Sequence, residues 1–183
     1  MEQAFAPAAE ASMKVTTSWL RDCSHLLHLF REEAPLPYAL CMFAYVDDDR
    51  TPAAMIEFFF YDEASERDPA SIHDVALALG RLVPLDEVIH VRDARVRPPW
   101  RTSALLPRLS VHTNTLGRSL GARYMTAASG GSTSGFLQPW RDEARRLGMF
   151  RCGGEERAWY LAPMRPLPQP ATPSVSSLSR DCP

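Results

Sequence analysis

Hydrophobic and polar positions follow two different periods along the chain. Residues 18–34 place Trp, Leu and Phe side chains at helical spacing, with Ser18 as an N-cap and Pro35 beyond the end. Residues 38–46 and 53–61 are apolar runs of the β type, and the turn-forming segment DDDRTP joins them. The pattern therefore predicts an amphipathic helix followed by an antiparallel hairpin.

The second half alternates strands and helices. A Ser-x-x-Asp capping pattern opens a short predicted helix at 71–82, and a strand follows at 87–96. A longer helix is expected from about 103 to 120, stopped by Gly121. The remaining pattern predicts a strand at 122–129, a helix within 132–148 closed by Gly148, and strands at 149–152 and 158–162. Strands and helices in this order predict a mixed α/β or α+β layer fold.

The two ends lack such patterns. The first twelve residues are rich in Ala without a periodic apolar face, and the segment after Pro163 is rich in Pro and Ser. Segments of this composition bury too little apolar surface to offset the entropy of ordering. We expect a disordered extension at 1–12, one domain at 13–163 and a disordered tail at 164–183.

Composition and charge argue against several classes of protein. With 183 residues and 45% hydrophobic content, the chain can bury one sizeable core, and its net charge of -2 gives no electrostatic reason to expect nucleic acid or an anionic membrane. No signal peptide or membrane-spanning stretch is evident, so we expect a cytoplasmic protein. The four cysteines lie far apart without a CxxC motif, which predicts reduced thiols rather than disulfides or a zinc site.

The segment VRPPWRTSALLPRL, residues 96–109, is the junction between a predicted strand and a predicted helix. Amides at the start of a helix carry partial positive charge and lack intrahelical partners, so such a junction can hold a phosphate. Arg97 and Arg101 would add full charges, while Thr102 and Ser103 can cap the helix. Many strand-to-helix turns hold no anion, and a purely structural junction is the alternative.

Residues 87–162 resemble the GCN5-related N-acetyltransferase (GNAT) family. ARVRPPWRTSALLPRL is similar to the strand end and pyrophosphate loop, LGARYMTAAS to the fifth strand, and EARRLGMF to the leucine-glycine-aromatic ending. The resemblance implies a single mixed, mostly antiparallel sheet flanked by helices, and an acyltransferase that uses acetyl-CoA or another acyl-CoA. The implied donor-binding residues are Val96, Arg97, Arg101, Thr102, Ser103, Ala104 and Leu105.

Three positions depart from the family pattern. The family loop reads Gln/Arg-x-x-Gly-x-Gly/Ala; with Arg101 in the leading position, Ala104 and Leu106 stand where small residues let phosphate approach the backbone. Ala144 stands where members of the family often have a tyrosine that protonates the departing thiolate. The resemblance thus keeps the loop arginine and leaves the general acid unassigned.

The resemblance also implies a carboxylate or histidine on the fourth strand that takes a proton from an amine. His90 lies on that strand, and its intrinsic pKa near neutrality suits proton abstraction. Glu87 precedes it by three residues and by alternation faces the other side. Glu57 stands between Ile56 and Phe58, where an acid must find a partner or line a cleft. The alternatives are a packing role for His90 and an exposed hairpin face for Glu57.

The loop SGGSTSG, residues 129–135, follows the fifth predicted strand. In the GNAT fold it would lie near the pantetheine arm, where Ser129 and Ser132 could donate hydrogen bonds; a flexible connector is about equally compatible with this composition. His25 and His28 share a helix face, but no further ligand completes a metal set. We expect no metal site.

Three hypotheses remain. The first is an acyl-CoA-dependent N-acyltransferase acting on a small-molecule amine by direct attack. The second is a relative of acyl-homoserine-lactone or N-acyl-amino-acid synthases, with acyl-carrier protein as donor, which fits the loop without glycine. The third is a non-catalytic binding protein with the same fold. A homodimer is a candidate assembly for such folds, and neither nucleic acid nor a membrane is an expected partner.

Overall fold

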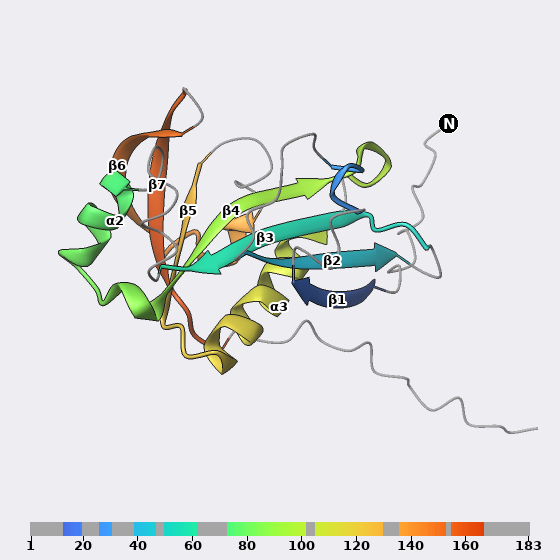
Figure 1. Ribbon diagram of the computed structural model, residues 1–183, viewed down its shortest axis with the longest axis horizontal. Coiled ribbons are helices and arrows are strands. Elements are labelled where there is room, and N and C mark those ends of the chain that lie inside the picture. The colour runs from blue at the N-terminus through green and yellow to red at the C-terminus, as the bar shows by residue number, and fades with distance from the viewer. Residues whose placement is uncertain are drawn as a thin grey trace, which may run out of the picture.

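A computed structural model describes residues 13–19, 26–30, 39–46, 50–61, 73–101, 105–129, 136–152 and 155–166. Its centre is a seven-stranded sheet with the order β1-β2-β3-β4-β5-β7-β6 (Figure 1). The strands are β1 (Met13–Trp19), β2 (Leu40–Val46), β3 (Ala54–Phe60), β4 (Val88–Val96), β5 (Tyr124–Ala128), β6 (Arg145–Cys152) and β7 (Glu155–Pro163).

Two helices and three 3₁₀ turns complete the described part of the fold. The helices are α2 (His73–Gly80) and α3 (Leu105–Ser119), and the turns are η2 (Leu85–Glu87), η3 (Pro98–Trp100) and η4 (Gln138–Trp140). Within these residues, no helix has the length and apolar character needed to cross a membrane.

The sheet is mixed and mostly antiparallel, as predicted. Every neighbouring pair of strands is antiparallel except β4 and β5, which are parallel. A parallel pair needs a crossover connection, and α3 supplies it between these two strands. The predicted hairpin is confirmed as β2 and β3, and the predicted elements at 71–82, 87–96, 103–120 and 122–129 are confirmed as α2, β4, α3 and β5.

The predicted helix at 18–34 is wrong at its start. Ser18 and Trp19 belong to β1, whose residues pair with β2 from Met13↔Val46 to Trp19↔Leu40. β-branched residues such as Val15 favour a strand, and the free edge of β2 supplies hydrogen-bond partners that a local helical spacing does not reveal. Of the rest of this predicted helix, residues 26–30 form a helical turn, and the other positions lie outside the described residues.

The predicted helix within 132–148 is also wrong where it can be checked. Only the short turn η4 is helical after residue 137, and β6 begins at Arg145. Gly148 does not end a helix; it lies in β6, with φ +154°, where the register with β7 shifts. Pairing with β7 therefore decides the structure of this segment, where the sequence pattern had predicted a helix.

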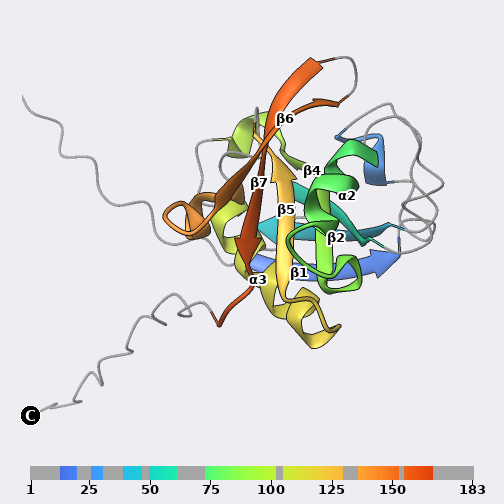
Figure 2. The same cartoon turned by 90° about the vertical axis from the view of Figure 1, so that its left-hand side faces the viewer.

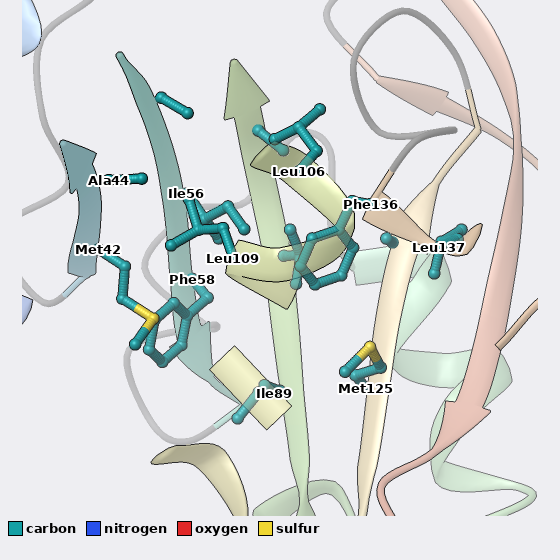
Figure 3. Packing of buried hydrophobic residues seen from close by; sticks show 14 of the residues in the cluster. Met42, Ala44, Ile56, Phe58, Ile89, Leu106, Leu109, Met125, Phe136 and Leu137 are labelled. Carbon is teal, nitrogen blue, oxygen red and sulfur yellow. The ribbon is translucent and has the colours of Figure 1, made fainter. Parts of the chain in front are cut away.

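The sheet separates cores on its two faces. The larger, which we call the α3-side core, packs α3 against the sheet and includes Ile56, Ile89, Leu109 and Phe136 (Figure 3). The α2-side core lies on the other face and joins α2 to Phe59, Tyr61, Val88 and Trp159. Figure 2 shows α2 and α3 on opposite sides of β5. A smaller cluster around Phe43 and Met55 shares the α2 face.

The predicted domain limits fall at or beyond the described residues and stay predictions. One detail bears on the C-terminal limit, which the sequence places after Pro163. Met164 is buried in the α3-side core, and Asn114 Nδ2 donates to the carbonyl oxygen of Arg165 at 2.8 Å. The packed chain therefore continues a few residues past β7.

Candidate functional site

The central feature is the point where β4 and β5 part. Their parallel pairing runs from Val88↔Tyr124 to Val91↔Ala127 and ends there, although β4 continues to Val96. Figure 1 shows the two strands diverging beyond this point. On its other side β4 stays paired with β3 up to Val96. One edge of β4 is therefore left without β5 as a partner over its last residues.

The described part of the junction from β4 to α3 contains the short turn η3. The Arg97 amide donates to the Ala53 carbonyl oxygen at 2.9 Å, which continues the ladder with β3. The turn η3 follows, and the Trp100 side chain packs against the α3-side core together with Val96. The predicted donor-binding residues Thr102, Ser103 and Ala104 lie outside the described residues.

The two arginines of the junction have different surroundings. Arg97 Nη1 donates to the Pro52 carbonyl oxygen at 3.4 Å, so its guanidinium is directed to the start of β3. Arg101 is exposed, and its backbone amide donates to the Pro98 carbonyl oxygen. No acidic residue stands in the first turn of α3. Arg101 and the first turn of α3 therefore combine positive charge without a neighbouring carboxylate in that turn.

The start of α3 is anchored by its apolar residues. Leu105 and Leu106 are 4% and 7% exposed and belong to the α3-side core. The isobutyl group of Leu106, which stands where the family pattern has a small residue, therefore packs inward. Pro107 lies in the first turn, where a missing amide hydrogen is tolerated, and its carbonyl oxygen accepts a bond from Ser110 Oγ at 2.6 Å.

His90 lies on the α2 face of β4, inside an aromatic cluster. It is 2% exposed, and its ring stacks on Trp159 with centroids 5.0 Å apart and packs against Phe59 at 4.9 Å. Tyr61 Oη lies 3.3 Å from Nδ1. Burial, aided by the charge of Arg92, lowers the pKa of His90 to about 3. The imidazole is therefore neutral at physiological pH and is a weak base.

Glu57 shares this face and is fully buried. Its Oε1 pairs with Arg92 Nη1 at 3.3 Å, and Asp93 stands directly across the β3–β4 ladder. A bulge explains the position of Arg92: Glu57 pairs with Asp93 and Phe58 with Val91, so Arg92 is an extra residue in β4. The predicted need of Glu57 for a partner is met by this arginine.

The structure brings together only part of the predicted site. His90 and Glu57 share the α2 face of the sheet, whereas Glu87 lies in η2, before β4, and pairs with Arg123 at 3.5 Å. The length of β4, roughly 30 Å at 3.3 Å per residue, separates Glu87 from the junction with α3. Ser129 follows β5 at the parting of the strands, and its amide donates to Ala158. Ser132 and the rest of that loop lie outside the described residues.

Sequence reasoning missed the groups that surround His90 and Glu57. Tyr61 directly follows β3 and Trp159 lies in β7, so only long-range strand pairing brings them to β4. Arg92 reaches Glu57 through a bulge that has no evident signal in the sequence. The apolar character of the FFFY run and of residues 158–162 indicated buried strands, and this was the only available hint.

The point where β4 and β5 part has two chemically different environments beside it, one at the start of α3 and one on the α2 face of the sheet. Toward α3 there are helix amides and an exposed arginine, which suit an anion. On the α2 face there is a neutral imidazole within an aromatic cluster, and the buried Glu57 carboxylate on the same face pairs with the partly exposed Arg92 guanidinium. Such an arrangement can hold an extended anionic ligand at one end and a neutral reacting group at the other.

No protein-family model matches the sequence, and no curated protein matches it either. Solved structures do match the fold. An agmatine N-acetyltransferase mutant is 13% identical, with a TM-score of 0.58, and the match covers 83% of this chain and 100% of that chain. A nourseothricin acetyltransferase is 15% identical, with a TM-score of 0.52 and coverage of 84% and 99%. AAC(6')-Ib with ribostamycin and coenzyme A is 9% identical, with a TM-score of 0.53 and coverage of 83% and 93%. The chain therefore has the fold of these N-acetyltransferases.

Proposed function

We propose that the protein is an acyl-CoA-dependent N-acyltransferase, most simply an acetyltransferase, that transfers an acyl group to a small-molecule amine by direct attack. The observation that carries this proposal is the end of β4–β5 pairing at Val91 and Ala127, followed by the junction from β4 into α3. The fold shared with N-acetyltransferases supports it.

In this proposal the donor lies along the parted edge of β4. Its diphosphate binds Arg101 and the backbone amides of Thr102, Ser103, Ala104 and Leu105, which lead into α3 in the sequence, with Val96 and Arg97 forming the strand end beside it. The exposed guanidinium and the absence of acidic residues in the first turn of α3 fit a diphosphate. The thioester end then lies near Ser129, at the end of β5.

The reaction needs one proton transfer. The lone pair of the neutral amine attacks the thioester carbon, the C–S bond breaks, and the coenzyme leaves as a thiolate that takes up the proton released by nitrogen. Neutral His90 accepts a hydrogen bond from the attacking amine, while its low pKa keeps it from retaining the proton. Glu57 holds Arg92 in place. Glu87, at the far end of β4, has no part in this proposal.

The acceptor class also rests on this proposal. Solved structures of the fold include an agmatine N-acetyltransferase, a nourseothricin acetyltransferase and AAC(6')-Ib in complex with ribostamycin. Because N-acetyl transfer needs an amine as acceptor, we infer a small amine for this chain. An acyl-carrier protein as donor is the alternative for the same chemistry, and a non-catalytic binding role is the alternative for the same fold. A cytoplasmic location and a homodimer stay predictions.

A thermal-shift panel of CoA thioesters tests the donor site. Acetyl-CoA or a longer acyl-CoA is expected to raise the melting temperature of the wild type, because a ligand that binds only the folded state stabilises it. Arg101→Glu should abolish this shift by placing a negative charge beside the diphosphate. Arg118→Glu is the matched control, since it makes the same charge change at an exposed position in the last turn of the same helix.

The outcomes separate the three hypotheses. A thioester shift that Arg101→Glu removes and Arg118→Glu keeps supports the transferase. A preference for a long acyl chain on carrier protein would favour the synthase-like alternative. If no thioester stabilises the wild type, the transferase proposal fails and a non-catalytic role is favoured.

A further inference from the structure

Trp159 on β7 carries a polar atom that the fold does not satisfy. The side chain is 1% exposed, and its indole Nε1 has no hydrogen-bond partner. Nε1–H is a donor only, and a buried donor without an acceptor costs free energy in the folded state. An unsatisfied donor of this kind is retained at the expense of stability, and a bound ligand oxygen would satisfy it.

The position of Trp159 links this donor to the parting of the strands. Trp159 pairs with Ala128, the last residue of β5 and the first beyond the end of β4–β5 pairing. Its ring reaches across β5 to stack on His90 of β4, with an interplanar angle of 21°. Ala128 belongs to the same core as Trp159. The donor thus belongs to the same face as the neutral imidazole.

A second tryptophan provides a comparison within the same protein. Trp140 in η4 is fully buried and its Nε1 also has no partner. It packs in the α3-side core against Phe136, with ring centroids 5.9 Å apart, on the opposite face from His90. The two residues share the same unsatisfied donor, and only Trp159 stacks on the candidate reaction centre.

The chemistry of acyl transfer indicates which ligand atom the indole N–H of Trp159 can bind, the amine nitrogen or the thioester oxygen. The attacking amine uses its lone pair to form the new bond, so a donor aimed at nitrogen would block the attack. The thioester oxygen, in contrast, gains negative charge when the carbonyl π electrons move onto it, and it returns them when the C–S bond breaks. A preorganised N–H that meets this oxygen stabilises the tetrahedral stage.

We propose that the indole N–H of Trp159 donates to the carbonyl oxygen of the bound acyl thioester. This inference rests on the proposed transferase function and deepens it by naming a residue for the oxyanion. Trp159 would touch the reacting oxygen, while His90, stacked on the same indole, faces the amine. The proton balance is unchanged, since the indole keeps its hydrogen throughout.

The test uses acetyl-CoA labelled with ¹³C at the carbonyl carbon, followed by infrared difference spectroscopy on the bound ligand. In the wild type the carbonyl band is expected at lower frequency than for free acetyl-CoA, because a hydrogen bond weakens the C=O bond. Trp159→Phe should return the band toward the free position, and Trp140→Phe should leave it shifted. Replacing Trp159 with 3-benzothienylalanine, which keeps the bicyclic shape without the N–H, guards against a misfolded Phe variant.

Turnover gives a second readout, with hydroxylamine as a small nucleophile. Loss of one oxyanion donor is expected to lower kcat about 100-fold, and acetyl-CoA affinity should change little, because the donor acts mainly at the tetrahedral stage. An unshifted carbonyl band in the wild type, or a shifted band and full kcat in both Trp159 variants, would overturn the inference. Failure of the wild type to bind any thioester is a different result, because it removes the proposed function itself.

Discussion

The two faces of the sheet differ in what they bury. On the α3 side, α3 itself buries polar groups in Ser110, Thr113 and Asn114, and each donates to a backbone carbonyl oxygen. On the α2 side, the described part of the sheet buries the carboxyl group of Glu57 and the imidazole of His90. A core can bury neutral hydrogen-bonded groups at little cost, whereas ionisable groups are costly to desolvate.

This difference indicates that the α3 side mainly stabilises the fold and that the α2 side is the candidate side for the chemistry. The α3-side core is the larger cluster and fixes the helix whose start adjoins Arg101. On the α2 face, burial of His90 in its neutral form and of Glu57 paired with Arg92 carries a desolvation cost that lowers the stability of the fold. Strongly perturbed titrating groups concentrate at functional sites, which favours the α2 face as the side of the chemistry. Mutations on the two faces should therefore differ in kind.

The largest effect on stability is expected on the α3 side. Leu109 is 0% exposed at the centre of that core, so Leu109→Ala should lower the free energy of unfolding by about 2–5 kcal/mol. Urea denaturation followed by circular dichroism measures this. Leu120→Ala is the matched control, because Leu120 is 51% exposed just after α3 and should cost about 0.5 kcal/mol or less. Equal costs for the two changes would contradict the assigned core.

On the α2 side, stability should depend on pH through His90. Its pKa is about 3 in the folded protein and about 6.5 when unfolded, so below pH 6.5 only the unfolded chain takes up the proton. The contribution of neutral His90 to the free energy of unfolding should therefore be fully present above pH 6.5. It should fall by about 1.4 kcal/mol per pH unit as the pH drops toward 3. Urea titrations at pH 7 and pH 5 should show a loss of about 2 kcal/mol in the wild type that His90→Phe removes.

His112 provides the control for this pH dependence. Desolvation by its neighbours and then the charge of Arg108 also lower the pKa of His112, although this residue lies on the exposed side of α3 and keeps contact with solvent, unlike His90. His112→Gln should therefore remove a smaller part of the acid destabilisation than His90→Phe. If His90→Phe retained the wild-type loss between pH 7 and pH 5, the buried neutral state of His90 would be refuted.

Removing either partner of the Glu57–Arg92 ion pair should lower stability, and removing the arginine should lower it more. Arg92→Met leaves the Glu57 carboxylate buried without this guanidinium and should cost about 1–2 kcal/mol, because a buried group that loses its partner keeps its desolvation penalty. Glu57→Gln should cost less, since the Arg92 side chain is 26% exposed and can be hydrated. Chemical denaturation of both variants and of the double variant measures the coupling between them.

A surface ion pair sets the scale for that result. Glu155 and Arg157 pair at 2.9 Å on β7, with side chains 71% and 40% exposed. Arg157→Met should cost about 0–1 kcal/mol, as is usual for exposed pairs. If Arg92→Met cost no more than Arg157→Met, the Glu57 carboxylate would not depend on its guanidinium.

Much of the fold followed from local pattern, and the failures have a common cause. α2, α3, the β2–β3 hairpin and β4 each showed their period within a short window. β1 and the start of β6 did not, because Ser18 and Arg145 are strand residues only through partners in β2 and β7. Edge strands depend on pairing that a single window does not contain.

The candidate site divides in a similar way, and the roles of its residues stay predictions. His90 was predicted from its strand and residue type, and Arg101 from the junction that precedes α3. Arg92 and Trp159 were not, since a bulge in β4 and a ring that crosses β5 bring them into place. Glu87 was judged by strand alternation, but it precedes the strand in η2. Positions fixed by tertiary contacts are those that the sequence alone could not supply.

The smallest expected effect concerns the close approach of α3 to the sheet at Gly117. An added Cβ would lie 2.6 Å from Met164 Cε and 3.1 Å from Ile89 Cδ1. Alanine favours a helix over glycine by about 1 kcal/mol, and displacement of the flexible Met164 end offsets this, so Gly117→Ala should change stability by less than about 1 kcal/mol.

Removing the contact with Met164 should reveal the stabilisation that alanine gives the helix at position 117. In a Met164→Ala background, Gly117→Ala should become stabilising by about 0.5 kcal/mol, because the helix propensity remains and the 2.6 Å overlap with Met164 is gone, leaving only the 3.1 Å contact with Ile89. Gly121→Ala is the contrasting control: with φ +102° and open space around it, the side chain would cost about 1 kcal/mol through backbone strain alone. A Gly117→Ala change that destabilised both backgrounds equally would place the constraint at Ile89 rather than at Met164, because the Ile89 side chain is the other close neighbour of the added Cβ.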